Sequence, residues 1–283
     1  MKVGIQLYSV RQSMAKDPIS TISKVAEAGY RNLEVANHNA ENDPGVGFGV
    51  SVADMKKLME EGRFNVFSAH AHPLLAEKVD PLLEYHSAIG TRYIAVPIDF
   101  FRDTDEIKKK AEEYNKVGEK CKKAGIQLVY HNHYHEFQQI NGETVLDTIL
   151  KNTDENLLKL ELDTYWVMRA GKDPIEVLKK LGKRVCLLHQ KDFAKGHEAE
   201  MDMLASVQPN EYIDMDRFRR DIKPEQFAEI GTGIMPIQNI IDTAKAHCDV
   251  EYIVLEQDYT VLDEIESVKA SMAEFKKFSG LTW

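Results

Sequence analysis

Three imidazoles and one carboxylate fall within six residues in the middle of the chain, in the segment YHNHYHEF at 130–137. The segment follows an apolar run at 126–130, which predicts a buried strand. Metal-binding side chains placed directly after a buried strand are typical of a metal site at the rim of an α/β barrel. A histidine-rich surface loop is the alternative, and the segment alone does not decide between the two.

Residues of the same kind follow three later apolar runs. Asp163 ends the run LKLELD, His189 follows VCLL, and Glu256 follows YIVL. Because the carboxyl ends of barrel strands meet at one rim, we expect Glu136 to converge there with Asp163, His189 and Glu256. Three carboxylates and one imidazole suit a divalent cation, with Mn²⁺ as our first expectation and Mg²⁺, Co²⁺ or Zn²⁺ as alternatives.

The elements that must position these residues alternate along the chain. Apolar runs predict eight strands, at 2–8, 33–35, 64–69, 93–96, 126–130, 159–162, 185–188 and 252–255. Helical patterns precede or follow them, at 17–29, 51–62, 76–89, 104–124, 173–181, 236–246 and 263–278. A long polar connection, at about 191–223, follows the seventh strand.

Strict alternation of strands and helices predicts a parallel sheet covered by helices. Eight such units in 283 residues favour a single-domain (β/α)8 TIM barrel. An open doubly wound sheet is the main alternative. Against it, the first strand is followed by SVRQS and not by a glycine-rich nucleotide-binding turn.

Composition narrows the classes of partner and compartment. The formal net charge of −10 disfavours a nucleic-acid partner, because phosphate binding needs a basic face. No apolar run reaches the roughly 18 residues of a membrane span. Cys121, Cys186 and Cys248 show no paired spacing, which suits a reducing compartment. We therefore predict a soluble cytoplasmic protein that contacts neither nucleic acid nor membrane.

The whole chain resembles the sugar phosphate isomerase/epimerase family, the xylose isomerase-like TIM barrels that also include endonuclease IV. The segments that carry the resemblance are GIQLYSVR (4–11), AGYRNLEV (28–35), YHNHYHEF (130–137), LELDTYWV (160–167), LLHQKDF (187–193), EIGTGIMP (229–236) and VLEQD (254–258). The resemblance implies a metal held by Glu136, Asp163, His189 and Glu256. Many members have the first glutamate at the strand end, where this chain has His131, so His131 or His133 is an alternative ligand.

The family chemistry that this resemblance implies is enolisation of a keto-sugar. A divalent ion that holds two adjacent sugar oxygens acidifies the neighbouring C–H group and stabilises the enediolate. The expected activity is a metal-dependent sugar isomerase or epimerase. Glu136 and Glu256 are expected to exchange the proton, with His133 or His135 assisting.

Four further residues are candidates for contact with a small-molecule sugar substrate. We expect His70, His131 and Trp166 to bind it, although Trp166 is slightly better suited to the core. Members of the ketose 3-epimerase branch have a histidine at the position of Trp166, so a simple ketose is not the expected substrate. Lys191 is expected to stabilise the enolate, or alternatively to be a surface lysine paired with Asp192.

Other functions use the same site. A lyase would use the same enolate to expel a neighbouring substituent, as in inosose dehydratases or the large subunits of C-glycoside deglycosidases. The insert at 194–223 would then cover a bulky aglycone or dock a small partner subunit. DNA repair of the endonuclease IV type ranks lower because the chain is acidic. Barrels of this kind often associate, and we expect a homo-oligomer.

Overall fold

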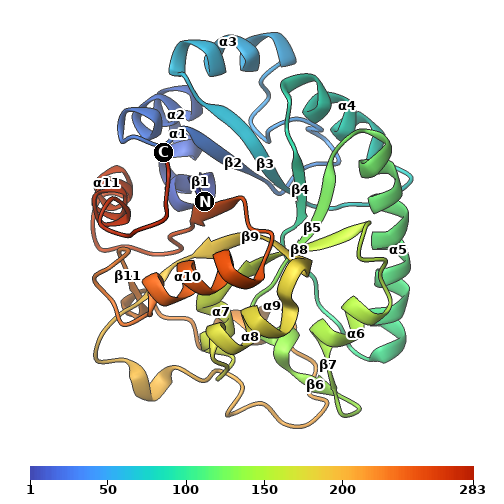
Figure 1. The fold of residues 1–283 in the computed structure, drawn as a ribbon. Helices are drawn as coiled ribbons and strands as arrows, with labels where there is room; N and C mark the ends of the chain where they lie inside the picture. Colours follow the sequence, from blue (N-terminus) through green and yellow to red (C-terminus); the bar gives the residue numbers. More distant parts are fainter.

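Eight parallel strands close into a barrel in the computed structural model, which describes residues 1–283 (Figure 1). The strands are β1 (Lys2–Gln6), β2 (Asn32–Asn37), β3 (Asn65–Ala71), β4 (Tyr93–Val96), β5 (Gln127–His131), β8 (Leu158–Asp163), β9 (Val185–Gln190) and β12 (Tyr252–Leu255). Each strand pairs with the next in chain order, and β12 pairs with β1 to close the ring. The predicted (β/α)8 barrel is confirmed, and each predicted strand overlaps an observed one.

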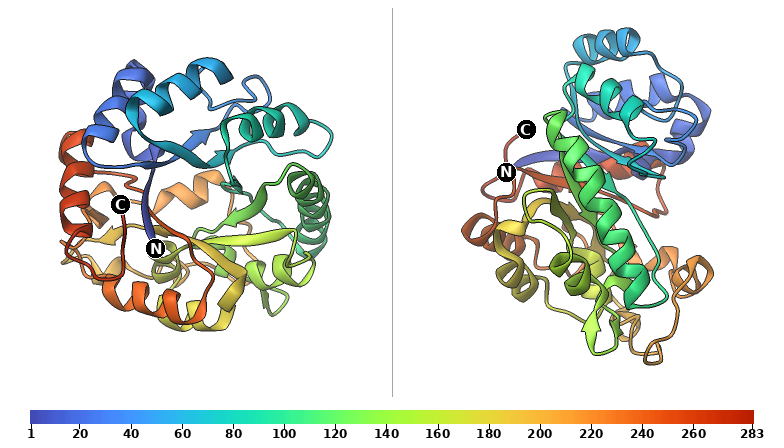
Figure 2. Two further views of the ribbon diagram at one scale, coloured as in Figure 1. Left: turned by 45° about the horizontal axis from the view of Figure 1, so that its top comes forward. Right: turned by 90° about the vertical axis from the view of Figure 1, so that its right-hand side faces the viewer.

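Helices surround the strands on the outside of the ring (Figure 2). They are α1 (Arg11–Lys16), α2 (Pro18–Glu27), α3 (Val52–Gly62), α4 (Asp80–Ile89), α5 (Thr104–Lys123), α6 (Val145–Lys151), α7 (Thr164–Arg169), α8 (Pro174–Leu181), α9 (Met215–Arg220), α10 (Ile237–His247) and α11 (Glu264–Phe275). No helix is both long and apolar enough to span a bilayer.

Capping explains where the longer helices begin. The side chains of Asp17, Ser51 and Asp103 each accept a hydrogen bond from a first-turn amide of α2, α3 and α5. The predicted start of α4 at residue 76 is wrong, since the helix begins at Asp80, with Pro81 in its first turn. Helices α1, α6, α7 and α9 were not predicted, because helices of six or seven residues are too short to show a clear 3.6-residue period.

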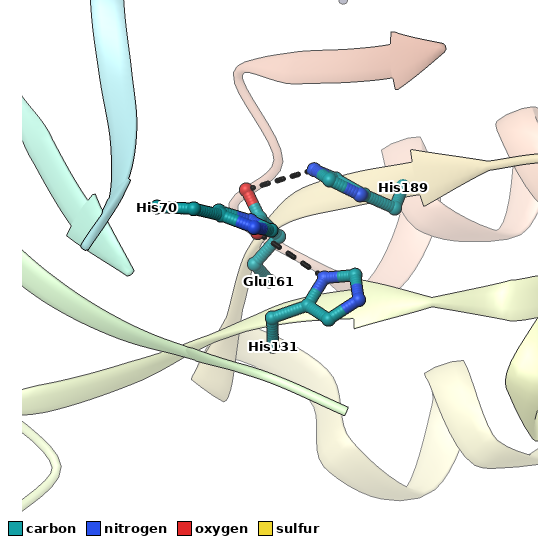
Figure 3. A group of neighbouring side chains, drawn as sticks. All are labelled: His70, His131, Glu161 and His189. Carbon is teal, nitrogen blue, oxygen red and sulfur yellow. Dashed lines mark hydrogen bonds and ion pairs between the residues drawn. The ribbon is translucent and has the colours of Figure 1, made fainter. Parts of the chain in front are cut away.

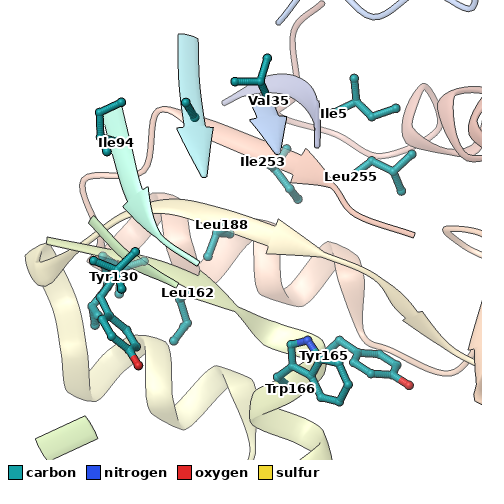
Figure 4. Close-up of a cluster of buried hydrophobic side chains, with 14 of the residues drawn as sticks. Ile5, Val35, Ile94, Tyr130, Leu162, Tyr165, Trp166, Leu188, Ile253 and Leu255 are labelled. Carbon is teal, nitrogen blue, oxygen red and sulfur yellow. The ribbon is translucent and has the colours of Figure 1, made fainter. Parts of the chain in front are cut away.

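Alternation along the barrel strands separates two layers of side chains. Apolar residues such as Ile5, Val35, Leu162, Leu188 and Leu255 belong to the large buried cluster that joins the strands to the helices (Figure 4). The residues between them point into the ring, because successive strand side chains face opposite sides. Toward the amino-terminal end, this interior is filled by a smaller apolar cluster: Phe67, Tyr93, Ala95, Val129, Cys186, Leu187, Tyr252 and Val254. Toward the carboxyl end, the interior is polar.

The long connection after β9 is partly structured. It contains β10 (Asp192–Phe193), which pairs with β11 (Phe227–Ala228), and it also contains α9. The remaining short elements of the chain are β6 (Gln139–Ile140), β7 (Glu143–Thr144), η1 (Leu7–Val10), η2 (His135–Phe137), η3 (Gly182–Arg184), η4 (Glu198–Glu200) and η5 (Pro224–Gln226).

The Asp192 carboxylate, at the beginning of this connection, hydrogen-bonds the backbone of the segment 231–235 that follows the connection. It accepts hydrogen bonds from the backbone amides of Gly231, Gly233 and Met235 at 2.9–3.0 Å. The approach is close at Gly233, where a Cβ atom would lie 2.3 Å from Asp192 Oδ1. Asp192 is thus occupied by backbone amides and is not the partner of Lys191.

Candidate metal centre

Four side chains from four successive barrel strands converge at the carboxyl end of the ring. They are His131 at the end of β5, Asp163 at the end of β8, His189 on β9 and Glu256 just after β12. One potential ligand atom from each lies within 4.8 Å of those of the other three. His131 Nε2 is 3.9 Å from both Asp163 Oδ2 and Glu256 Oε2. His189 Nδ1 is 3.0 Å from Glu256 Oε2. We call these four residues the outer group.

The Lys191 ammonium lies against the two carboxylates of the outer group. Its Nζ is 2.5 Å from Asp163 Oδ2, and it also bonds Glu256. Burial by itself would lower the pKa of Lys191, but the nearby Asp163, Asp258 and Glu256 carboxylates outweigh burial and raise it. Lys191 is almost completely buried, so it is a charged group of the site and not a surface lysine.

A second set of ligand-type side chains lies one step deeper in the barrel. Glu161 precedes Asp163 by two residues on β8, so both point into the ring. Its carboxylate lies between three imidazoles (Figure 3). Glu161 Oε2 is 2.6 Å from His70 Nε2 and 3.3 Å from His131 Nδ1, and Glu161 Oε1 is 3.3 Å from His189 Nε2. We call His70, His131, Glu161 and His189 the inner group.

A second buried carboxylate, Glu34 on β2, adjoins the inner group. Glu34 Oε2 is 2.6 Å from His189 Nε2 and accepts a 2.9 Å hydrogen bond from the Gln6 amide. Burial, and then the neighbouring Glu161 charge, raise the pKa of Glu34. Burial alone would raise the pKa of Glu161 too, but the imidazoles of His189 and His70 lower it well below its ordinary value.

Glu136, expected as the ligand from the fifth strand, is not in the outer group. Its Oε1 accepts a 2.8 Å hydrogen bond from the Tyr130 hydroxyl, and its Oε2 accepts one of 2.8 Å from the His133 amide. β5 ends at His131, and the chain then turns through η2, which directs the Glu136 carboxylate back onto that turn. The structure therefore corrects the expected set, because His131 stands in the outer group where Glu136 was predicted.

A pocket with a volume of about 250 Å³ opens over the outer group. Two of the group's residues, His131 and Glu256, line it. The expected substrate-binding residues His70 and Trp166 line it too. Helix α9 of the long connection supplies one wall with the side chains of Met215, Phe218 and Arg219, and Ile222, just past the helix, adds to it. The connection thus covers the site instead of extending away from it, and eight of the 16 lining residues are hydrophobic.

Three buried polar atoms of the pocket residues have no hydrogen-bond partner within the protein: Trp166 Nε1, His133 Nδ1 and His131 Nδ1. The Trp166 and His133 rings pack against each other with centroids 5.4 Å apart, and the indole is 2% exposed. Burial, and then the neighbouring imidazoles of His131 and His135, lower the pKa of His133 well below its ordinary value. Since a buried indole N–H usually has a hydrogen-bond acceptor, a bound molecule would supply one here.

His135, expected to assist catalysis, lies outside the pocket. Its Nε2 is 2.8 Å from the backbone oxygen of Asp99, and its ring stacks on Phe100 at 5.0 Å. Sequence reasoning also missed Glu34 and Glu161. The two-residue alternation in LELD would have placed Glu161 on the same face as Asp163. For Glu34, within NLEVAN, the sequence carries only the weaker signal of a charged residue inside an apolar strand.

Asp258 was left without a role by sequence reasoning, yet it lines the pocket. Burial raises the pKa of Asp258 to about 7, against the opposing effect of Lys191, whose Nζ is 3.9 Å away.

Comparison with known proteins adds relatives of this barrel. A family model described as xylose isomerase-like TIM barrel matches residues 22–278. An inosose dehydratase of Clostridium perfringens is 30% identical over 213 residues, which cover 66% of this chain and 68% of the relative. An inosose dehydratase of Clostridium beijerinckii is 25% identical, covering 92% and 89%. A solved sugar phosphate isomerase/epimerase from Parabacteroides distasonis matches with a TM-score of 0.75 at 26% identity, covering 96% of this chain and 92% of that one.

Proposed function

This chain belongs to the xylose isomerase-like TIM barrel family, as its motifs predicted, and we propose that it is a divalent-metal-dependent lyase that dehydrates a keto-polyol. The observation that carries the proposal is the outer group at the floor of the pocket, with a buried ammonium beside it. The relatives named inosose dehydratase support elimination of water as the reaction.

The donor set fits a divalent ion. His131, Asp163, His189 and Glu256 would hold it with two nitrogen and two oxygen atoms. When bound, the ion would polarise the substrate carbonyl and acidify the neighbouring C–H group. Our expectation of Mn²⁺ assumed three carboxylates and one imidazole. Two imidazoles favour Zn²⁺ or Co²⁺ instead.

The side chains around the pocket would carry the proton. We assign the His133 imidazole as the base that takes the proton from the carbon next to the carbonyl. The C–H electron pair forms a C=C bond, and the C–O bond on the next carbon breaks. His133 then returns the proton to the departing hydroxyl, which leaves as water. The Lys191 ammonium stabilises the negative charge that develops on the carbonyl oxygen.

A sugar isomerase or epimerase is the second candidate, and the similar structure from Parabacteroides distasonis supports it. Epimerisation needs a proton-transfer group on each face of the reacting carbon. The pair expected for this task was Glu136 and Glu256, but the Glu136 carboxylate is engaged by Tyr130 and the His133 amide. Elimination on one face needs only one such group, so this arrangement favours the lyase.

Incubation of the protein with an inosose in D₂O, followed by NMR and mass spectrometry, tests the proposal. We expect a product lighter by one water, with the ultraviolet absorbance of a conjugated enone. Treatment with EDTA should abolish the reaction, and Zn²⁺ or Co²⁺ should restore it. Deuterium uptake without loss of water would select the epimerase. A protein that neither exchanges deuterium nor releases water with any keto-polyol would overturn both.

Two neighbouring histidines provide a matched pair of variants for the assay. His133→Asn should lower kcat by about 100-fold or more, because it removes the proposed base. His135→Asn should change kcat little, since that imidazole lies outside the pocket against the backbone of Asp99. Equal effects of the two substitutions would contradict the role given to His133.

A further inference from the structure

The His131 imidazole faces both groups at once, with one ring nitrogen toward each. Its Nε2 is 3.9 Å from Asp163 Oδ2 and from Glu256 Oε2, in the outer group. Its Nδ1 is 3.3 Å from Glu161 Oε2, in the inner group, and forms no hydrogen bond. The two nitrogens of one ring point in different directions, so they cannot both bind the same ion. The ring nitrogen with which His131 binds the ion therefore determines whether the ion lies in the outer or the inner group.

The His189 imidazole also faces both groups, but its Nδ1 is directed toward the outer group and its Nε2 toward the buried carboxylates. Its Nδ1 lies 3.0 Å from Glu256 Oε2 in the outer group. Its Nε2 lies 2.6 Å from Glu34 Oε2 and 3.3 Å from Glu161 Oε1. Each imidazole thus has a carboxylate of the outer group on one side and a fully buried carboxylate on the other.

Two imidazoles at the depth of the inner group are in direct contact with buried carboxylates. His70 Nε2 is 2.6 Å from Glu161 Oε2, and His189 Nε2 is 2.6 Å from Glu34 Oε2. An ion at this depth would have to break both contacts. The carboxylate of the inner group, Glu161, has no exposed surface and does not line the pocket, whereas Glu256 of the outer group does.

We infer that Glu161 and Glu34 are positioning residues that select the ring nitrogen with which each histidine binds the metal. With the metal bound, Glu161, whose Oε2 lies 3.3 Å from the unpartnered Nδ1 of His131, receives the Nδ1 proton, which leaves Nε2 free for the outer group. Glu34 receives the Nε2 proton of His189, which leaves Nδ1 free for the same group. A carboxylate behind a ligating histidine fixes its tautomer and raises its basicity. This inference rests on the proposed metal site, and it makes the chain a one-ion protein.

NMR of the ¹⁵N-histidine-labelled protein loaded with Zn²⁺ tests this inference without a variant. Long-range ¹H–¹⁵N correlations report which nitrogen of each ring carries a proton and which binds metal. We expect a protonated Nδ1 on His131, a protonated Nε2 on His189, and one Zn²⁺ per chain. The opposite tautomers, or two Zn²⁺ ions per chain, would overturn the inference while leaving the metal site in place. A protein that binds no Zn²⁺ would instead overturn the metal site of the proposed function.

Variants then measure the strength of the effect. Glu161→Gln keeps a hydrogen-bond acceptor but removes the charge, and we expect Zn²⁺ affinity to fall about 10–100-fold with the His131 tautomer retained. Glu136→Gln is the matched control, because that carboxylate is equally buried but lies outside both groups. Equal Zn²⁺ affinity of Glu161→Gln and the unmodified protein would contradict the positioning role.

Discussion

Because His131, and not Glu136, lies in the outer group, substitutions of these two residues should have different effects on metal affinity. His131→Ala removes one of the four proposed ligands. Partners that only orient a ligand are worth about 10–100-fold in metal affinity, so loss of the ligand itself should cost about 100-fold or more. That ratio corresponds to about 2.7 kcal/mol of binding free energy. Glu136→Ala should leave the affinity within about threefold of its original value, because the carboxylate is in neither group.

Although Glu136→Ala should hardly change metal affinity, it should clearly lower the stability of the protein. The Glu136 carboxylate accepts hydrogen bonds from the Tyr130 hydroxyl and the His133 amide, both at 2.8 Å. A buried donor left without a partner costs about 1–3 kcal/mol, so Glu136→Ala should lower the free energy of unfolding by about 2–6 kcal/mol. Glu136→Gln should lose less, since its amide oxygen can still accept one of the two bonds.

Two measurements check this pair. Competition with a chromophoric chelator gives the Zn²⁺ affinity of each folded variant, and urea unfolding of the metal-free protein gives the stability. The reasoning fails if Glu136→Gln weakens Zn²⁺ binding by more than about tenfold, or if His131→Ala does not weaken it.

Three further predictions concern other parts of the molecule. Trp166→Phe keeps the ring but removes the unpartnered N–H, so KM should rise about tenfold at nearly constant kcat; an unchanged KM would exclude that contact. Burial lowers the pKa of His86 to about 4, below its unfolded value of about 6.5. Its contribution to stability is therefore complete above pH 6.5 and is lost as the pH falls toward 4, up to about 3 kcal/mol. His86→Gln should remove that part of the pH dependence in unfolding experiments, and an identical pH profile would count against it. Gly233→Ala should lower the free energy of unfolding by about 2 kcal/mol, because the new Cβ would lie 2.3 Å from Asp192 Oδ1 and from the Phe193 carbonyl oxygen; a neutral effect in thermal unfolding would contradict the close approach.

The sequence by itself determined the barrel and three members of the outer group. Apolar runs of strand length, separated by capped helices, depend only on local patterns, and those patterns predicted all eight strands. Asp163, His189 and Glu256 each stand at or just past the end of a strand, and parallel strands that close into a ring bring those ends to one rim. For these residues, position along the strand was sufficient to place the side chain.

Only the tertiary structure decided which residue near the end of the fifth strand joins the outer group, and which side chains the buried carboxylates contact. Glu136 lies beyond the strand end, and the η2 turn, not the strand, sets the direction of its carboxylate. Glu34 and Glu161 come from strands far apart in the chain, and they meet His189 only because the ring closes. The sequence records which side chains point inward. The distances between them depend on the packing of strands that the chain brings together only when it folds.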